Sequence, residues 1–255
     1  MATATDERVD SVKQWKIYLY LPLIYILMQV CSIFVAEGFT MMFNGNADLT
    51  EKEATFKGFA WSLFIVNTVA AILFLLLLTP NKKFFTVFKG KKASVGNTIL
   101  WGFLGFILAM GGQMLAAAIE HAFGVKPGSE NTALLADIAK TSPIVIISIV
   151  LFAPFLEEII FRRVIFGGIY LKTNFWIAAV LSAVVFAAVH NELEHLLLYM
   201  MPALVFAYVY YRTKRLITPM ISHLLMNGFV VIAQLNYEKL QRLQDMKQGI
   251  ILFFN

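Results

Sequence analysis

The sequence has little charge for its length. Only 15% of its 255 residues are Asp, Glu, Lys or Arg, and 59% are hydrophobic, whereas about a quarter of a soluble domain is usually charged. The mean hydropathy is +0.73, and the apolar residues fall into long uncharged runs. Such runs are what a bilayer crossing requires, so the sequence predicts an integral membrane protein and not a soluble one.

Cysteine and polar linkers are also scarce. The single cysteine, Cys31, excludes an intramolecular disulfide and a cysteine-based zinc site. No low-complexity segment or linker marks a boundary, so we expect residues 1–255 to form a single integral membrane domain. The net charge of +5 lies mostly beside hydrophobic segments, which is typical of membrane topology. We therefore expect the lipid bilayer, and no nucleic acid, as a partner.

Seven uncharged runs indicate the membrane helices. They are Ile17–Ala36, Gly58–Thr79, Ala93–Ile119, Thr141–Leu156, Thr173–Val189, Leu196–Tyr211 and Leu216–Tyr237. The fifth and sixth are short for a full crossing, which needs about 20 residues. The predicted fold is all-α: a polytopic transmembrane bundle of about seven to eight membrane helices around a buried polar active site.

Basic residues alternate with acidic ones between these runs. The loop at 80–92 and the segments near 162–172 and 212–215 are basic, whereas 37–57 and 191–194 are acidic. The positive-inside rule then places the N-terminus in the cytoplasm of a multi-pass cell-membrane protein. Lys239, Arg242 and Lys247 would lie on the wrong side, so the tail is expected to form an interfacial helix unless a short run is re-entrant.

Ionisable groups at membrane depth are costly and indicate function. Glu120 and His121 end the third run, and we expect both to reach the interface. The other such groups, together with one asparagine, gather in the second half of the chain. They are Glu157, Glu158, Arg162, Arg163, His190, His195, His223 and Asn227.

Helical spacing assigns these groups to faces. Glu158 and Arg162 are four residues apart and can form an ion pair, while Glu157 points about 100° away from Glu158. Arg163 is expected to reach toward the cytoplasm. Phe186 is likewise four residues before His190, and His223 is four residues before Asn227, so each pair shares a helix face.

Length arguments bring these segments together. A helix that turns near Thr173–Asn174 and returns antiparallel puts Glu157 and His190 at the same level, about 24 Å from the turn. His223 lies about 10 Å into its span from a basic loop. The polar groups are therefore expected to meet in the cytoplasmic half of the membrane, with Glu157 turned toward His190.

A carboxylate and a histidine in a low-dielectric site can activate water, and a histidine with an asparagine can stabilise an oxyanion. This is a set of groups for amide hydrolysis that requires no cofactor. Zinc held by Glu157, His190 and His223 is the alternative. The stretch "HNELEH" at 190–195 does not support it, because its histidines are five residues apart and not four.

Taken singly, these residues have simpler interpretations. Glu158 and Arg162 could be a structural brace, and either histidine could be a satisfied core residue. The combination of E-E-x-x-x-R, F-x-x-x-H and H-x-x-x-N on three successive hydrophobic segments is far more specific.

The stretches "EEIIFR", "FAAVH" and "HLLMN" resemble the three signature motifs of the CPBP family, the CAAX-protease and bacteriocin-processing membrane proteases. The resemblance covers about residues 140–236, which would be the catalytic core. It implies that Glu157 and His190 activate water and that His223 and Asn227 form the oxyanion site. It also implies that Glu158 and Arg162 are a supporting ion pair.

The sequence thus predicts an intramembrane endopeptidase that cleaves a hydrophobic or lipidated peptide, such as a leader or a peptide precursor. The compact domain and basic loops suggest a bacterial plasma membrane. One rival is a non-enzymatic bacteriocin-immunity or scaffold protein. A proton-coupled transporter is another, although no internal repeat supports it. The oligomeric state is left open.

Overall fold

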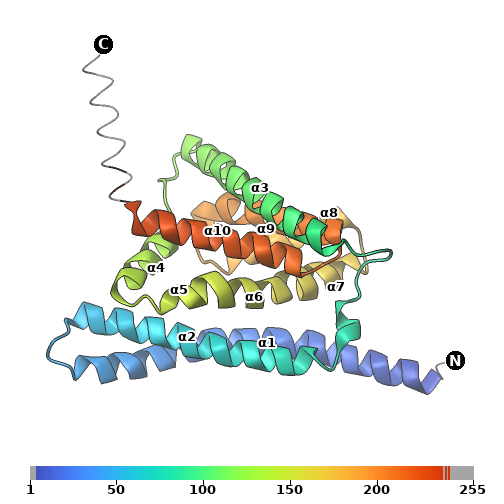
Figure 1. The fold of residues 1–255 in the computed structure, drawn as a ribbon, viewed down its shortest axis with the longest axis horizontal. Helices are drawn as coiled ribbons and strands as arrows, with labels where there is room; N and C mark the ends of the chain where they lie inside the picture. The colour runs from blue at the N-terminus through green and yellow to red at the C-terminus, as the bar shows by residue number, and fades with distance from the viewer. Residues whose placement is uncertain (1–3, 238, 240, 242–255) are drawn as a thin grey trace, which may run out of the picture.

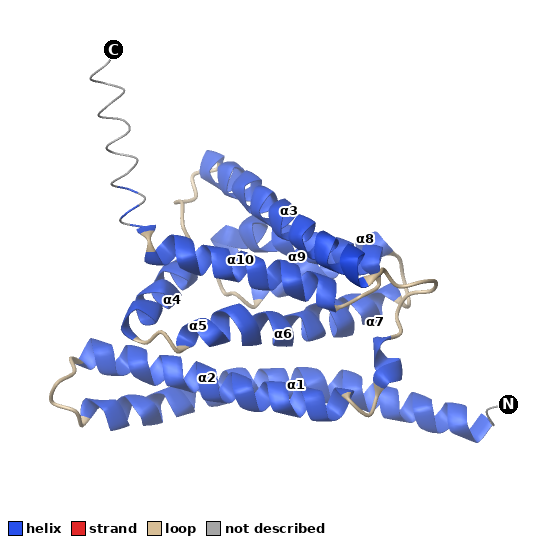
Figure 2. Cartoon of the chain, viewed as in Figure 1, coloured by secondary structure: helices blue, strands red, loops and turns tan. Residues whose placement is uncertain are grey.

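The structure is a computed structural model that describes residues 4–237, 239 and 241. Those residues form helices and loops without a strand (Figure 2). The all-α prediction is therefore confirmed. Most of the helices run along one direction, and most connecting segments lie at the two ends (Figure 1).

The chain begins with a long helical hairpin. Helix α1 (Ala4–Asn44) turns back into α2 (Glu51–Leu78), and a short 3-10 turn, η1 (Lys82–Phe85), follows. Thr50 starts α2 with a capping box: its side chain accepts from the Glu53 N–H, and the Glu53 carboxylate accepts from the Thr50 N–H. The hairpin lies beside the rest of the bundle as a separate layer (Figure 1).

The segment that carries the first motif is a central helix built from α-helical and π-helical turns. It consists of α5 (Val145–Ile147), η2 (Ser148–Phe152), α6 (Ala153–Glu157), η3 (Glu158–Phe166) and α7 (Gly167–Tyr170). Its η2 and η3 parts are π-helical: the Ala153 N–H donates to the Ser148 carbonyl, five residues back. It packs against the α1–α2 hairpin.

Five further helices complete the bundle. They are α3 (Val95–Ala122), α4 (Glu130–Thr141), α8 (Phe175–Ala188), α9 (Leu196–Thr213), which follows the 3-10 turn η4 (Leu193–His195), and α10 (Ile217–Leu235). Asn174 caps α8 through its side chain, so the turn expected near Thr173–Asn174 is confirmed. Helix α3 packs on both α9 and α10.

Among the residues that the structure describes, five helical stretches are long and apolar enough to cross a membrane. They are Trp15–Asn44, Glu51–Leu78, Val95–Ala122, Leu193–Thr213 and Ile217–Leu235. The chain is therefore a multi-pass membrane protein. The fourth expected run lies in the central helix, and the fifth forms the 14-residue α8, which spans only about 21 Å.

Arg163 was expected to reach toward the cytoplasm, but its side chain is buried. Its guanidinium donates to the Phe84 carbonyl and, over 2.6 Å, to the Tyr18 hydroxyl. It also lies 3.8 Å from the centroid of the Phe84 ring. A carbonyl, a hydroxyl and an aromatic face replace its water, so Arg163 anchors α1 and η1 to the central helix.

Glu120 was expected to reach the interface, but its side chain is buried and paired within the fold. Its Oε2 atom is 3.0 Å from Nδ1 of His195, and its Oε1 atom accepts a 3.0 Å hydrogen bond from the Leu198 N–H. The carboxylate therefore holds the first turn of α9 against α3, where helix N-termini favour negative charge.

Two predictions are not tested by the helices. The interfacial helix expected around Arg242 and Lys247 lies outside the described residues. The organisation of residues 1–255 as a single domain, with a core at 140–236, stays a prediction.

Candidate active site

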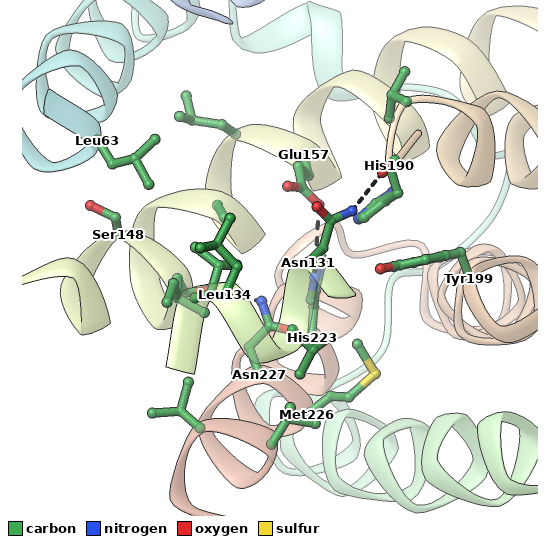
Figure 3. A pocket seen from close by; sticks show the side chains of 18 of the residues that line it. Leu63, Asn131, Leu134, Ser148, Glu157, His190, Tyr199, His223, Met226 and Asn227 are labelled. Carbon is green, nitrogen blue, oxygen red and sulfur yellow. Dashed lines mark hydrogen bonds and ion pairs between the residues drawn. The ribbon is translucent and has the colours of Figure 1, made fainter. Parts of the chain in front are cut away.

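All four residues predicted to be catalytic line one cavity of about 510 Å³. Glu157 comes from the central helix, His190 from the end of α8, and His223 and Asn227 from α10. Figure 3 shows these side chains around the same space. The cavity extends between the α1–α2 hairpin and the central helix, so residues of α1 and α2 also line it.

The supporting pair lies behind the cavity wall. Glu158 and Arg162 are both fully buried, and their Oε2 and Nε atoms are 3.0 Å apart. The Arg162 guanidinium also lies 4.9 Å from the Phe186 ring centroid and 5.4 Å from that of Phe206. The predicted ion pair therefore exists, and two aromatic faces enclose its cation where water is absent.

Glu158 joins this pair to α10. Its Oε1 atom accepts a hydrogen bond from the Nδ1–H of His223 over 2.9 Å. The Nε2 atom of His223 then lies 3.8 Å from Oε2 of Glu157. Glu157 thus approaches His223, a contact that the sequence did not indicate, and it lines the cavity together with His190, toward which we expected it to turn.

His190 is held in one tautomer by its own helix. Its Nδ1 is 2.8 Å from the Phe186 carbonyl, which can only accept, so the proton is on Nδ1. In its neutral form the ring therefore has a lone pair on Nε2. Tyr199 stacks on the ring with centroids 4.1 Å apart. Phe186, the first residue of the second motif, thus supplies both a carbonyl for His190 and a face for Arg162.

Asn227 is oriented by the π-helical part of the central helix. Its Nδ2 donates to the Ile149 carbonyl over 2.9 Å. In the π register this carbonyl would accept from residue 154, but Pro154 has no N–H. The unpaired carbonyl is thus available to Asn227. One amide hydrogen of Asn227 remains for a ligand in the cavity.

Sequence reasoning missed a polar latch between α4 and the loop after His190, made of Asn131, Glu192 and Tyr199. Glu192 accepts from the Asn131 N–H (2.8 Å) and from the Tyr199 hydroxyl (2.7 Å). The Asn131 side chain donates to the His190 carbonyl over 2.6 Å (Figure 3). No spacing pattern links Asn131 to Glu192, because they are 61 residues apart.

The direction of the pKa shift of Glu192 agrees with these hydrogen bonds. Partial burial tends to raise the pKa of Glu192, but the hydrogen bonds from Asn131, Tyr199 and Ser129, together with the charge of His195, outweigh it and lower the pKa. Glu192 is therefore an ionised acceptor that fixes the backbone beside His190.

The zinc alternative requires three converging ligands. Within the described part of the chain, no group of three His, Cys, Asp or Glu side chains is arranged to hold a metal ion. Nδ1 of His223 is bonded to Glu158 and Nδ1 of His190 to a carbonyl, which leaves Nε2 of each ring free; such bonds also support histidines that ligate a metal. The side chains of Glu157, His190 and His223 are thus not converged on one point, and the metal-independent mechanism stays a prediction.

Comparison with known proteins identifies the family. Residues 139–229 match the family described as type II CAAX prenyl endopeptidase Rce1-like. The chain is 39% identical to "Putative membrane peptidase YdiL" of Bacillus subtilis, over 86% of this chain and 90% of the relative. It is 33% identical to "Membrane-embedded CAAX protease MroQ" of Staphylococcus aureus, over 91% and 95%.

The chain belongs to the CAAX-type membrane proteases. The resemblance read from the three motifs is thereby confirmed, and so is the prediction of an enzyme. No solved structure matches this member of the family. The individual roles of its motif residues rest on the geometry above.

Proposed function

We propose that this CAAX-type protease hydrolyses a peptide bond inside the membrane with a water molecule activated by Glu157 and His190. The observation that carries the proposal is the cavity itself, which Glu157, His190, His223 and Asn227 all line. Its side chains supply hydrogen-bond acceptors for water and donors for a developing negative charge.

Glu157 and His190 supply the two hydrogen-bond acceptors for the water molecule. Glu157 is a carboxylate, and His190 presents the lone pair of Nε2 because its Nδ1–H is bonded to a carbonyl. A water molecule that donates one hydrogen to each directs an oxygen lone pair at the substrate carbonyl. As the new C–O bond forms, Glu157 accepts the water proton and later delivers it to the leaving amine.

The donors are His223 and Asn227. Asn227 has one amide hydrogen left for the oxyanion. His223 can donate from Nε2 only as an imidazolium, because its Nδ1–H already points at Glu158. In this arrangement Glu158 and Arg162 support His223 and do not touch the substrate.

The proposed substrate is a hydrophobic or lipidated peptide, such as a leader or a precursor. Much of the cavity wall is apolar, and it lies between the hairpin and the catalytic helices, within the membrane-spanning part of the chain. His223 is about 10 Å into its span from the basic loop, which supports a site toward the cytoplasmic half. The two bacterial relatives support a bacterial plasma membrane.

The test compares Glu157→Gln and His190→Gln with two matched controls, Glu194→Gln and His121→Gln. Glu194 and His121 are exposed and do not line the cavity. Each variant is expressed in cells that lack the native protein, and membrane peptides are compared by untargeted mass spectrometry. We expect uncleaved precursors to accumulate with the first two variants only, at equal levels of inserted protein.

Two results would change the proposal. If Glu157→Gln and His190→Gln leave the membrane peptides and the phenotype unchanged, the cavity serves binding, and the immunity or scaffold interpretation replaces the enzymatic mechanism. If a strong chelator abolishes cleavage by purified protein and zinc restores it, the metal-independent mechanism is wrong.

A further inference from the structure

A second cleft, of about 530 Å³, lies at the basic end of the bundle, apart from the catalytic cavity. One wall is the segment that leads into α3, and the other is the end of α9. The residues that line it are Lys91, Lys92, Ala93, Ser94, Asn97, Trp101, Arg212 and Thr213. Neither the family motifs nor the proposed hydrolysis uses this cleft.

The charged side chains that line this cleft are all positive. Lys91, Lys92 and Arg212 contribute three cations, and no ion pair to any of them occurs among the described residues. The sequence has no Asp or Glu between Glu53 and Glu120, nor between Glu194 and Glu238, so neither wall supplies an acid. Three uncompensated cations around one cleft favour an anionic ligand.

The two walls are fixed to each other before any ligand binds. The Ala93 N–H donates to the Thr213 carbonyl over 3.0 Å, and the Arg215 guanidinium donates to the Ala93 carbonyl. Thr213 is buried, and its hydroxyl donates to the Val209 carbonyl over 2.7 Å. The cleft is therefore a built feature of the fold and not a gap between mobile loops.

Backbone amides add to the side-chain cations. The 28-residue α3 starts at this cleft, and its Ser94 cap accepts only from the Asn97 N–H. The amides of Val95 and Gly96 are thus left at the positive end of the helix dipole, as at phosphate-binding helix N-termini. Lysines, an arginine and a helix N-terminus together are suited to a phosphate group.

The level of the cleft matches the lipid headgroups. Trp101 and Tyr208 lie edge to face with ring centroids 6.0 Å apart, and the Arg212 guanidinium lies 5.4 Å from the Trp101 ring. Tryptophan and tyrosine mark the membrane–water interface. Trp101 is less than two helical turns from Ser94, so the cleft opens at that interface.

We propose that this cleft binds the phosphate group of an anionic phospholipid, with Lys91, Lys92 and Arg212 as its cations and the first turn of α3 as its amide donor. A bound lipid would join the start of α3 to the end of α9, directly before the helix that carries His223. Anionic lipid is thus a structural ligand of this membrane protein.

The test measures the melting temperature of the purified, delipidated full-length protein in neutral detergent as short-chain phosphatidylglycerol is added. A ligand of the folded state raises the melting temperature in proportion to its occupancy. Lys91→Gln/Lys92→Gln is compared with Lys82→Gln/Lys89→Gln, which removes the same charge from the same loop. All four lysines are exposed, so both variants are expected to fold.

We expect phosphatidylglycerol to stabilise the wild type and the Lys82/Lys89 variant with the same midpoint concentration. For the Lys91/Lys92 variant the midpoint should rise by roughly 25-fold, since each cation near a membrane surface contributes about fivefold. Arg212→Gln should show the same direction of change. Phosphatidylcholine should not stabilise any of the proteins.

Several outcomes would overturn the proposal. An equal loss in both double variants would show diffuse surface charge and no site. Stabilisation by inorganic phosphate or glycerol phosphate at the same concentrations would show a free-anion site. Stabilisation by an acidic peptide and not by lipid would assign the cleft to a peptide. No effect of phosphatidylglycerol on the wild type would also reject it.

Discussion

The described residues include two buried histidine–glutamate pairs with the same local geometry and different surroundings. Nδ1 of His223 is 2.9 Å from Glu158, and Nδ1 of His195 is 3.0 Å from Glu120. Each pair joins two segments that are distant in sequence. Only the first pair borders the cavity, where Nε2 of His223 is 3.8 Å from Glu157.

The difference lies in what the remaining atoms contact. The second oxygen of Glu120 accepts from the Leu198 N–H, which closes that pair within the fold. The second oxygen of Glu158 pairs with Arg162, and its histidine keeps a ring nitrogen toward the cavity. A buried histidine–carboxylate pair is therefore no evidence of catalysis; a second polar group across an open cavity is the distinguishing feature.

The largest expected effect separates the two histidines. His223→Ala should lower kcat/KM for peptide cleavage by about 10²–10³-fold, because it removes a donor to the oxyanion. His195→Ala should leave cleavage per folded molecule near wild type and cost about 1–3 kcal/mol of stability, since Glu120 loses a buried partner. Cleavage rates and melting temperatures on the same samples check both, and similar rates for the two variants would refute the comparison.

Substitution of Arg162 tests whether its ion pair with Glu158 also stabilises the fold. Arg162→Met should destabilise the protein by about 3–5 kcal/mol, because it leaves the fully buried Glu158 without its cation. The double variant Glu158→Gln/Arg162→Met should be less destabilised than the single one, since no uncompensated charge remains. Unfolding in mixed micelles measures both, and strict additivity would contradict the pairing.

Pro154 gives a smaller effect inside the cavity wall. Pro154→Ala supplies an N–H that competes with Asn227 for the Ile149 carbonyl, so Asn227 is held less firmly. One hydrogen bond of about 1 kcal/mol corresponds to a roughly fivefold lower cleavage rate. Asn227→Ala should lower the rate further, and Pro154→Ala should have no effect in that background. Equal losses in both backgrounds would show that Pro154 acts elsewhere.

The smallest effect concerns the latch at Glu192. Its pKa is lowered in the folded protein from an ordinary value of 4.5. The stability it provides is therefore complete above that value and is lost as the pH falls through the lowered pKa. Melting temperatures of the wild type and Glu192→Gln should converge on acidification below about pH 4.5. Parallel curves down to pH 3 would rule out ionised Glu192 as the acceptor.

The positions of the motif residues were predictable because they depend on helical periodicity. Four-residue spacing put Glu158 beside Arg162 and His223 beside Asn227, and antiparallel return through Asn174 brought His190 to the same cavity. These relations follow from the rise and repeat of a helix and need no knowledge of the other segments.

The roles of Arg163, Glu120 and Glu192 were not predictable, because their partners come from other segments. Arg163 depends on Tyr18 and Phe84, which lie 145 and 79 residues away. The π-helical turns have no periodic signature, yet they leave the Ile149 carbonyl to Asn227. The approach of Glu157 to His223 likewise joins two separate helices, and helical periodicity did not indicate it.

The most direct test of the central claim compares Glu157→Gln with Glu120→Gln in lipid bilayers. Cleavage rate and folded fraction are measured on the same samples. Glu157→Gln should retain under about 1% of the wild-type rate with an unchanged melting temperature, because it removes the base that accepts the water proton. Glu120→Gln should melt earlier and still cleave when folded. Wild-type cleavage by folded Glu157→Gln would contradict the account.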